Sequence, residues 1–201
     1  MAGIRKFKTK QPRQGWADCF LKAASLAFLI YIFVCQISQV EGKSMEPTFK
    51  TDDMLIVEKI TYCLRDVRRF DVIVFKVPPQ GARTTDRTKG KSYDYIKRVI
   101  GLPGEKVELQ YGNLYINDKP VLQPFVDQEH EDSGIKKDLS NYGPEIVPYG
   151  HYVVMGDNRG KSSDSRNNKA WKFVPETCIR GIVRVRFVPL KHFKVFTGES
   201  Y

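Results

Sequence analysis

Three copies of the tripeptide Gly-Lys-Ser are the first residues in the chain that could do chemistry, because this tripeptide ends the phosphate-binding P-loop. They lie at 42–44, 90–92 and 160–162. A P-loop also needs a glycine five positions before the tripeptide's own glycine, since its backbone amides cradle the phosphates. Those positions hold Ile37, Thr85 and Met155. The sequence therefore does not predict a nucleotide site.

The histidines and cysteines do not form a recognisable metal or redox motif. His130, His151 and His192 lie far apart, and no pattern makes one of them the base of a Ser-His-Asp triad. The cysteines contain no Cys-x-x-C pair; they are Cys19, Cys35, Cys63 and Cys178. We therefore predict no metal and no cofactor. Whether Cys63 and Cys178 form a disulfide or stay free thiols is left open.

Lys97 is a candidate base for a serine hydrolase that lacks a histidine base. A lysine can act in this way only when burial lowers the pKa of its amine towards the working pH. Alternation along a strand places Lys97 on the same face as Tyr95 and Val99. Its neighbour Arg98 then lies on the opposite face, so one of the two cations must point inward. Taken alone, such a lysine is also typical of an edge strand kept soluble by charge.

Ser44 and Lys97 each belong to one of four sequence blocks that can be compared with known motifs. They are SMEPT at 44–48, RFDVIVF at 69–75, YIKRVIGLPGE at 95–105 and GDNRGKSSDSR at 156–166. In this order, behind an apolar N-terminal segment, the blocks resemble the motifs of the type I signal peptidases, which are serine proteases with a Ser/Lys dyad. One short block would mean little, but four in order are highly specific.

The resemblance implies a role for each matching residue. Ser44 would be the nucleophile that forms an acyl-enzyme, and Lys97 would be its general base. Ser162 would orient the lysine amine through a hydrogen bond, while Asp164 and Arg166 would support the site.

The resemblance also implies an oxyanion hole and a substrate-binding region around Gly42 and Met45. In this family the nucleophile's backbone amide binds the oxyanion, and some members add a hydroxyl two residues earlier. Gly42 occupies that position, so a second donor is absent or comes from another group. We further expect Met45 and Phe49 to be exposed and to dip into the bilayer.

An apolar segment at 19–40 has about the length of a membrane span. Residues 1–18 form a basic tail; its cations are Arg5, Lys6, Lys8, Lys10 and Arg13. Because cytoplasmic flanks are enriched in Lys and Arg, we expect a single-pass protein of the cell inner (cytoplasmic) membrane, with its N-terminus in the cytoplasm. A cleaved signal peptide is the alternative, but the run is longer than a usual h-region and no small-x-small site follows it.

Residues 41–201 predict an extracytoplasmic catalytic domain rich in β-strands. Short β-branched runs, broken by Pro, Gly and Asp, lie at 54–60, 71–77, 95–101, 106–111, 113–118, 152–157 and 179–190. The polar, proline-rich stretches at 78–93 and 119–150 are expected insertions. The expected fold is mainly β, a signal-peptidase-like antiparallel sheet domain preceded by one transmembrane helix.

The resemblance implies that the substrates are preproteins bearing signal peptides, with small residues at the first and third positions before the cut. A monomer that contacts membrane lipid and does not bind nucleic acid is expected, and the net charge of +10 suits an anionic membrane. Two alternatives stay open. One is a catalytically inactive, membrane-anchored binding protein on the same scaffold. The other is a LexA-like Ser/Lys self-cleaving protein, which would carry a DNA-binding helix-turn-helix instead of the apolar segment.

Overall fold

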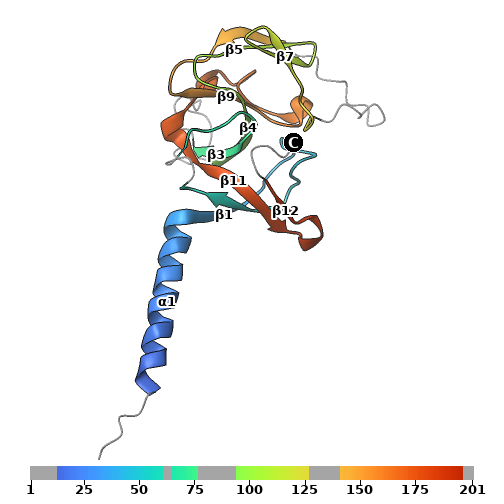
Figure 1. The fold of residues 1–201 in the computed structure, drawn as a ribbon. Helices are drawn as coiled ribbons and strands as arrows, with labels where there is room; N and C mark the ends of the chain where they lie inside the picture. Colours follow the sequence, from blue (N-terminus) through green and yellow to red (C-terminus); the bar gives the residue numbers. More distant parts are fainter. Residues whose placement is uncertain (1–12, 61–64, 77–93, 127–140, 197–201) are drawn as a thin grey trace, which may run out of the picture.

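The computed structural model describes residues 13–60, 65–76, 94–126 and 141–196, and in this part of the chain one long helix leads into a body of two β-sheets (Figure 1). The helix α1 spans Arg13–Val34. It is followed directly by the first strand, so the helix end is joined to the body without a linker.

The larger sheet has eight strands, all paired antiparallel, in the order β1-β2-β11-β3-β4-β9-β10, with β12 also pairing with β11. Its strands are β1 (Cys35–Gln39), β2 (Met54–Glu58), β3 (Val72–Lys76), β4 (Asp94–Gly101), β9 (His151–Met155), β10 (Val174–Pro175), β11 (Ile179–Val188) and β12 (Lys194–Val195). The strand β4, which carries Lys97, lies between β3 and β9 and is therefore not an edge strand.

The smaller sheet has four antiparallel strands in the order β7-β6-β5-β8. They are β5 (Lys106–Gln110), β6 (Asn113–Ile116), β7 (Lys119–Val121) and β8 (Tyr142–Ile146). Four short 3₁₀ turns complete the described elements: η2 (Arg159–Lys161), η3 (Lys169–Trp171), η4 (Glu176–Cys178) and η5 (Leu190–His192). The prediction of a mainly β, antiparallel domain is confirmed. Two short strands, β7 and β8, lie inside the stretch at 119–150 that we expected to be irregular, and the predicted insertion at 78–93 falls outside the described residues.

The apolar segment predicted at 19–40 is not a single helix. Residues 35–39 leave the helix because they pair in register with β2, from Cys35 opposite Glu58 to Gln39 opposite Met54. The strand's hydrogen bonds thus replace those of a further helical turn. Within the described residues, no helix combines the length and the hydropathy that a membrane span requires.

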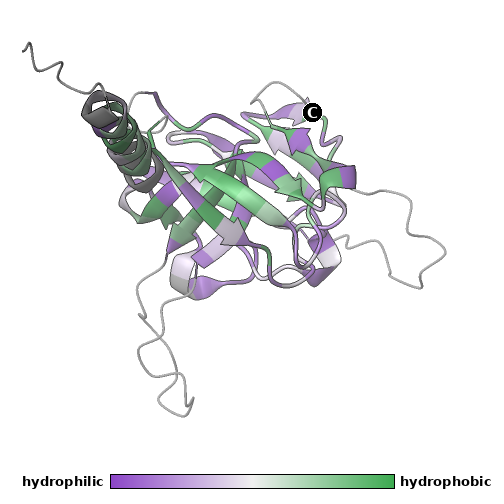
Figure 2. Ribbon diagram, turned by 90° about the horizontal axis from the view of Figure 1, so that it is seen from below, coloured by the Kyte–Doolittle hydropathy of each residue, from purple (hydrophilic) through white to green (hydrophobic). Residues whose placement is uncertain are grey.

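Buried apolar side chains form three clusters that cover both faces of the larger sheet. One cluster includes Ile73, Phe75 and Trp171. A second joins the two sheets and contains Ile100, Met155, Leu109 and Leu114 among others. The third packs the segment after β1 onto the sheet through Met45, Phe49, Leu55, Val72 and Val183. Hydrophobic and hydrophilic residues are interleaved along the strands (Figure 2), as expected for side chains that alternate between two faces.

The sequence predicts that one of the two cations of β4 points inward, and in the structure both do, because both faces of the sheet are covered. Lys97 is 4% exposed and Arg98 is 0% exposed. Alternation assigns the two side chains to opposite faces, but it does not reveal that both faces are covered. Each cation must therefore find a partner inside the protein or give up its charge, because an unpaired buried charge is very costly.

Candidate active site

The amine of Lys97 lies within hydrogen-bonding distance of the hydroxyl of Ser44. Lys97 Nζ donates to Ser44 Oγ over 2.8 Å and to the carbonyl oxygen of Ile96 over 3.0 Å. Ser44 is half-buried in the turn after β1, whereas Lys97 is buried on β4. The fold thus brings together two side chains separated by 53 residues, with the hydroxyl nearer to solvent than the amine.

Burial lowers the pKa of Lys97 from 10.5 to about 8. The carboxylates of Asp164 and Asp157 act in the opposite direction, because their negative charge favours the ammonium form, but desolvation outweighs them. At pH 7 roughly one amine in ten is therefore neutral, which is far more than for a solvated lysine. A neutral amine that contacts a serine hydroxyl can take the hydroxyl proton.

Gly156, which follows β9, packs directly against the turn that carries Ser44. A Cβ at this position would collide with the carbonyl oxygen of Ser44 and with Ser162 Oγ, and would lie 2.6 Å from Ser162 Cβ. Two residues later, the amide of Asn158 donates to the same Ser44 carbonyl oxygen over 3.1 Å. The backbone of the nucleophile candidate is therefore fixed from the strand β9 side by close approach and by a hydrogen bond.

A buried ion pair between Arg98 and Asp157 joins the same turn to β4. Arg98 Nε and Nη2 donate to the two carboxylate oxygens of Asp157 over 2.8 and 2.6 Å, and both side chains are fully buried. The hydroxyl of Thr48 donates to Asp157 over 2.6 Å, and Arg98 Nη1 donates to the carbonyl oxygen of Phe70 over 2.9 Å. The guanidinium also stacks 4.1 Å from the ring centroid of Phe125. Bidentate geometry and several acceptors satisfy the buried charge.

Asp164 and Arg166 form a second ion pair beside the site. Arg166 Nε and Nη2 donate to the two oxygens of Asp164 over 2.9 and 3.0 Å, and the amide of Gly156 donates to Asp164 over 2.9 Å. Burial by itself would raise the pKa of Asp164, but Arg166 and the Gly156 amide together hold this pKa below its usual value. The carboxylate therefore stays charged and keeps Gly156 in place.

Ser162 is close to the site but does not make the hydrogen bond that the resemblance implies. Its hydroxyl is buried and makes no hydrogen bond of normal geometry among the residues that the structure describes, but it faces the carboxylate of Asp164 and helps to lower the pKa of that group. The Lys97 amine is oriented instead by the carbonyl oxygen of Ile96 and by Ser44.

Met45 and Phe49 are not exposed, contrary to expectation. Their exposed fractions are 1% and 0%, and both belong to the apolar cluster formed with Val72, Val74 and Val183. The turn after β1 folds its apolar side chains onto the sheet, so these two residues are not available to enter a bilayer. Burial of two such side chains contributes about 3–6 kcal/mol and fastens the Ser44 turn to the core.

Gly42 takes a left-handed backbone conformation with φ +86°, and no atom would lie within 4 Å of a Cβ there. A serine at this position would have space but a strained backbone, which explains the glycine. Among the described residues, the amide of Ser44 donates no hydrogen bond. An amide in this state can donate to a developing oxyanion, and that role of the Ser44 amide stays a prediction.

Sequence reasoning missed Gly156, Asp157, Thr48 and Arg98 as parts of the site. All four belong to the sequence blocks quoted above, so the signal was present, but their contacts link distant residues such as Thr48 and Asp157, which are 109 positions apart. In the described part of the chain, no three His, Cys, Asp or Glu side chains come together as metal ligands. Cys178 is a free thiol, and Cys63 lies outside the described residues.

Comparison with known proteins places these features in a family. Residues 13–188 match the family model described as signal peptidase, peptidase S26. The chain is 35% identical over 200 residues to "Probable signal peptidase I-2" from Synechocystis, covering 97% of this chain and 84% of that protein. It is 37% identical over 196 residues to signal peptidase I from Bacillus caldolyticus, covering 94% and 98% of the two chains. A crystal structure of a signal peptidase I from Enterococcus faecalis is 28% identical and covers 59% of this chain and 97% of that chain, with a TM-score of 0.43. The chain therefore belongs to the S26 signal peptidase family and is a serine peptidase, as the four sequence blocks predict.

Proposed function

We propose that this protein is a membrane-anchored endopeptidase that removes N-terminal signal peptides from exported preproteins, with Ser44 as nucleophile and Lys97 as general base. The observation that carries the proposal is the 2.8 Å contact between Lys97 Nζ and Ser44 Oγ, in which the amine is buried and its pKa is about 8. The relatives' names support the substrate class, since they are signal peptidases I.

The reaction would proceed through an acyl-enzyme. Ser44 Oγ attacks the scissile carbonyl carbon, its proton moves to Lys97 Nζ, and the carbonyl oxygen becomes an oxyanion that accepts a hydrogen bond from the Ser44 amide. The C–N bond then breaks, and the departing amine takes the proton from the Lys97 ammonium. In the second half, the neutral amine of Lys97 accepts a proton from water as the water attacks the acyl carbon. The ester C–O bond then breaks, and the Lys97 ammonium returns the proton to Ser44 Oγ.

The surrounding residues would position these two groups. Asp164 and Arg166 hold Gly156, which together with Asn158 contacts the backbone of Ser44. Asp157 and Thr48 tie the Ser44 turn to β4, where Lys97 lies. A flexible lysine side chain benefits from such support because proton transfer depends on a well-aligned contact. Ser162, whose buried hydroxyl lies beside Asp164, would supply a further hydrogen bond to the Lys97 amine during the reaction.

Anchoring in the cell inner membrane is part of the proposal. It is supported by the apolar segment at 19–40, by the basic residues that precede it, and by the direct passage from α1 into β1. Residues 1–18 would remain in the cytoplasm, and residues 41–201 would form the extracytoplasmic catalytic domain. Ser44 would then lie only a few residues beyond the membrane, where the cleavage site of an inserted signal sequence emerges.

The decisive test is incubation of the detergent-solubilised full chain with a preprotein, compared with the variant Ser44→Ala. We expect the wild type to yield the mature protein and the variant to leave the preprotein intact. Binding without cleavage by both proteins would favour the inactive binding protein. Cleavage of the chain itself, with the preprotein left intact, would favour the self-cleaving alternative.

The pH dependence of cleavage follows from the pKa of Lys97. The active form is the neutral amine, so protonation below about pH 8 removes activity and deprotonation above it restores activity. We expect kcat/KM for a peptide substrate to rise about tenfold per pH unit below pH 7 and to level off above about pH 9. The profile is measured between pH 6 and pH 10, with the folded state followed by tryptophan fluorescence. A profile that is flat, or that falls between pH 7 and pH 9, would contradict the role of Lys97.

A further inference from the structure

Gln123 is a buried polar side chain that the proposed mechanism does not use. It follows β7 of the smaller sheet and is 9% exposed. Its amide nitrogen donates to the carbonyl oxygen of Gly112 over 3.1 Å, and its amide oxygen accepts a hydrogen bond from Nη2 of Arg159. Buried polar side chains are hydrogen-bonded because their loss of water must be offset. One end of this amide is therefore bound by the smaller sheet and the other by the segment after β9.

Arg159 is a buried cation whose hydrogen bonds go to neutral acceptors. The carboxylates that attract it, those of Asp157 and Asp164, are already bound by other arginines. Its Nε donates instead to the carbonyl oxygen of Gly156 over 3.1 Å, while its Nη2 donates to Gln123. A planar guanidinium holds its donors in a fixed fork, so fixing Nη2 also fixes the direction of Nε. Gln123 thus aims the donor that binds Gly156.

Gly156 is held through both of its peptide groups. Its amide donates to Asp164 over 2.9 Å, and its carbonyl oxygen accepts the hydrogen bond from Arg159. Its backbone lies so close to the carbonyl oxygen of Ser44 that a Cβ would not fit between them. A rotation of either peptide group therefore moves the surface against which the Ser44 turn rests.

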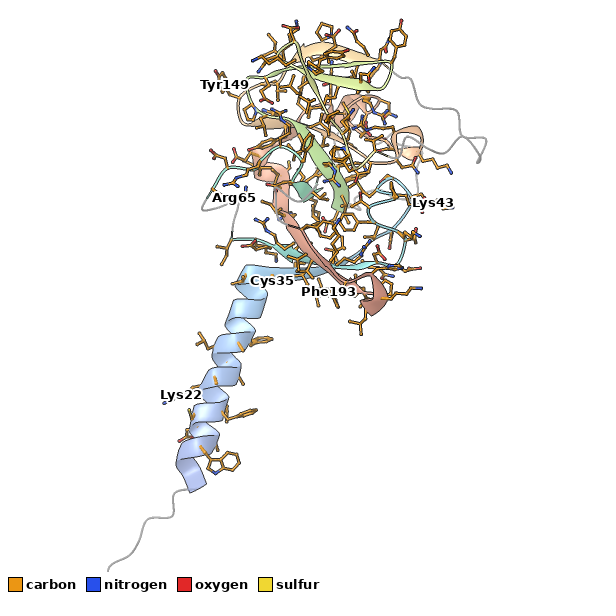
Figure 3. All side chains as sticks on the ribbon, turned by 45° about the vertical axis from the view of Figure 1, so that its right-hand side comes forward. Lys22, Cys35, Lys43, Arg65, Tyr149 and Phe193 are labelled. Atoms are coloured by element: carbon orange, nitrogen blue, oxygen red, sulfur yellow. The ribbon has the colours of Figure 1, made fainter. Side chains whose placement is uncertain are left out.

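The smaller sheet itself lies away from the serine–lysine pair. In Figure 1, β5 and β7 lie at the end of the body opposite to α1. Figure 3 shows Lys43, the neighbour of Ser44, at a height between Cys35 at the start of β1 and Tyr149 at the far end. An influence of the smaller sheet on the nucleophile must therefore pass through intermediate residues, and the contacts from Gln123 to Ser44 form such a connection.

We propose that Gln123 is a positioning residue for the peptidase reaction, because it aims Arg159 at the Gly156 carbonyl and so fixes the backbone against which the Ser44 turn rests. This inference rests on the proposed function, since it concerns the rate of the reaction of Ser44 with Lys97. Without an acceptor at position 123, a buried N–H of Arg159 loses its partner and the guanidinium turns towards another acceptor. Nucleophile and base are then aligned in a smaller fraction of the molecules, so that kcat falls more than KM rises.

The kinetic test uses the detergent-solubilised full chain and a peptide substrate. Gln123→Leu, which has no hydrogen-bonding group, is expected to lower kcat per folded molecule about 20-fold, with KM within threefold of the wild type. Gln123→Glu restores the acceptor for Arg159 but not the donor for Gly112, and its kcat should stay within threefold of the wild type. The matched control is Gln110→Leu, at an exposed position of β5, which should change neither constant. An unchanged kcat in Gln123→Leu, or no rescue by glutamate, would overturn the proposal.

Hydrogen exchange tests the same connection without activity. The amide of Asn158 donates to the carbonyl oxygen of Ser44, so its exchange rate reports how firmly the Ser44 turn is held. We expect this amide to exchange at least fivefold faster in Gln123→Leu and at the wild-type rate in Gln123→Glu and Gln110→Leu. Equal rates in Gln123→Leu and the wild type would contradict the positioning role.

Two further outcomes are decided by the same measurements. If Gln123→Leu does not fold, Gln123→Asn takes its place, because its amide is one methylene too short to reach Arg159 and the same losses of kcat and of protection are expected. A wild type that cleaves no substrate would refute the proposed function, and the exchange rate of Asn158 would still decide whether Gln123 positions the Ser44 turn.

Discussion

Replacing Lys97 by methionine is expected to lower kcat/KM for preprotein cleavage at least about 1,000-fold. Methionine keeps an unbranched apolar side chain of similar length but has no group that can take the proton of Ser44. The contact of 2.8 Å between the amine and the hydroxyl is lost with it. Residual cleavage would then come from the Ser44 amide and from substrate binding alone.

The same change is expected to stabilise the fold. The pKa of Lys97 is 10.5 when solvated and about 8 in the folded protein, so the unfolded chain binds the proton more tightly. At about 1.4 kcal/mol per pKa unit, burial of the charged amine costs about 3 kcal/mol. The cost is present in full below about pH 8 and disappears as the pH rises towards 10.5. Lys97→Met should therefore raise the free energy of unfolding at pH 7 by up to about 3 kcal/mol, and by much less at pH 10.

Both effects can be measured on one preparation, by peptide cleavage and by denaturant unfolding followed through the buried Trp171. The matched control is Lys161→Met, which removes an exposed lysine next to Ser162 and should alter neither activity nor stability. If Lys97→Met is inactive and also less stable than the wild type at pH 7, then burial does not lower the pKa of the Lys97 amine in the folded protein. A variant that keeps more than a tenth of the activity would rule out Lys97 as the base.

Replacing Gly156 by alanine is expected to lower kcat about 100-fold, with a smaller change in KM. The new methyl group would collide with the carbonyl oxygen of Ser44 and with the side chain of Ser162. The collision with a backbone atom is the important one, because it can be relieved only by moving the Ser44 turn or the segment after β9. A shift of about 1 Å between nucleophile and base is enough for a loss of this size.

Gly181→Ala provides the control for a crowded glycine away from the site. A Cβ there would collide with the carbonyl oxygen of Glu58 and lie 2.8 Å from a methyl group of Val57, between β11 and β2. We expect Gly181→Ala to lower the melting temperature but to leave kcat per folded molecule within about threefold of the wild type. Gly156→Ala with kcat unchanged, or both variants with the same loss of kcat, would show that Gly156 has no special relation to Ser44.

Local patterns in the sequence were enough to predict most of the fold class and to single out Ser44 and Lys97. Alternation predicts strands such as 54–60 and 179–190 because a half-buried strand presents successive side chains to opposite faces. Turn residues separate these runs, and this is enough to indicate an antiparallel sheet. Four blocks in order singled out Ser44 and Lys97 before any contact between them was known.

What alternation cannot tell is what covers each face. Met45 and Phe49 follow an apolar segment and read as exposed membrane contacts, yet both are packed onto the sheet. The sequence left open whether Lys97 or Arg98 points inward. Both are buried, and the charge of Arg98 is neutralised by Asp157, 59 residues away. Contacts over such separations depend on the whole set of strand pairings, and no local pattern specifies them.

The sequence by itself determined the peptidase family and the β-rich body and singled out Ser44 and Lys97 as candidates, because each of these depends on residue types within short blocks. Only the tertiary structure decided where the helix ends, which side chains hold the Ser44 turn and how far the pKa of Lys97 falls. These features depend on strand pairing, on burial on both faces of a sheet and on charges brought together from distant positions, and such quantities exist only once the chain is folded.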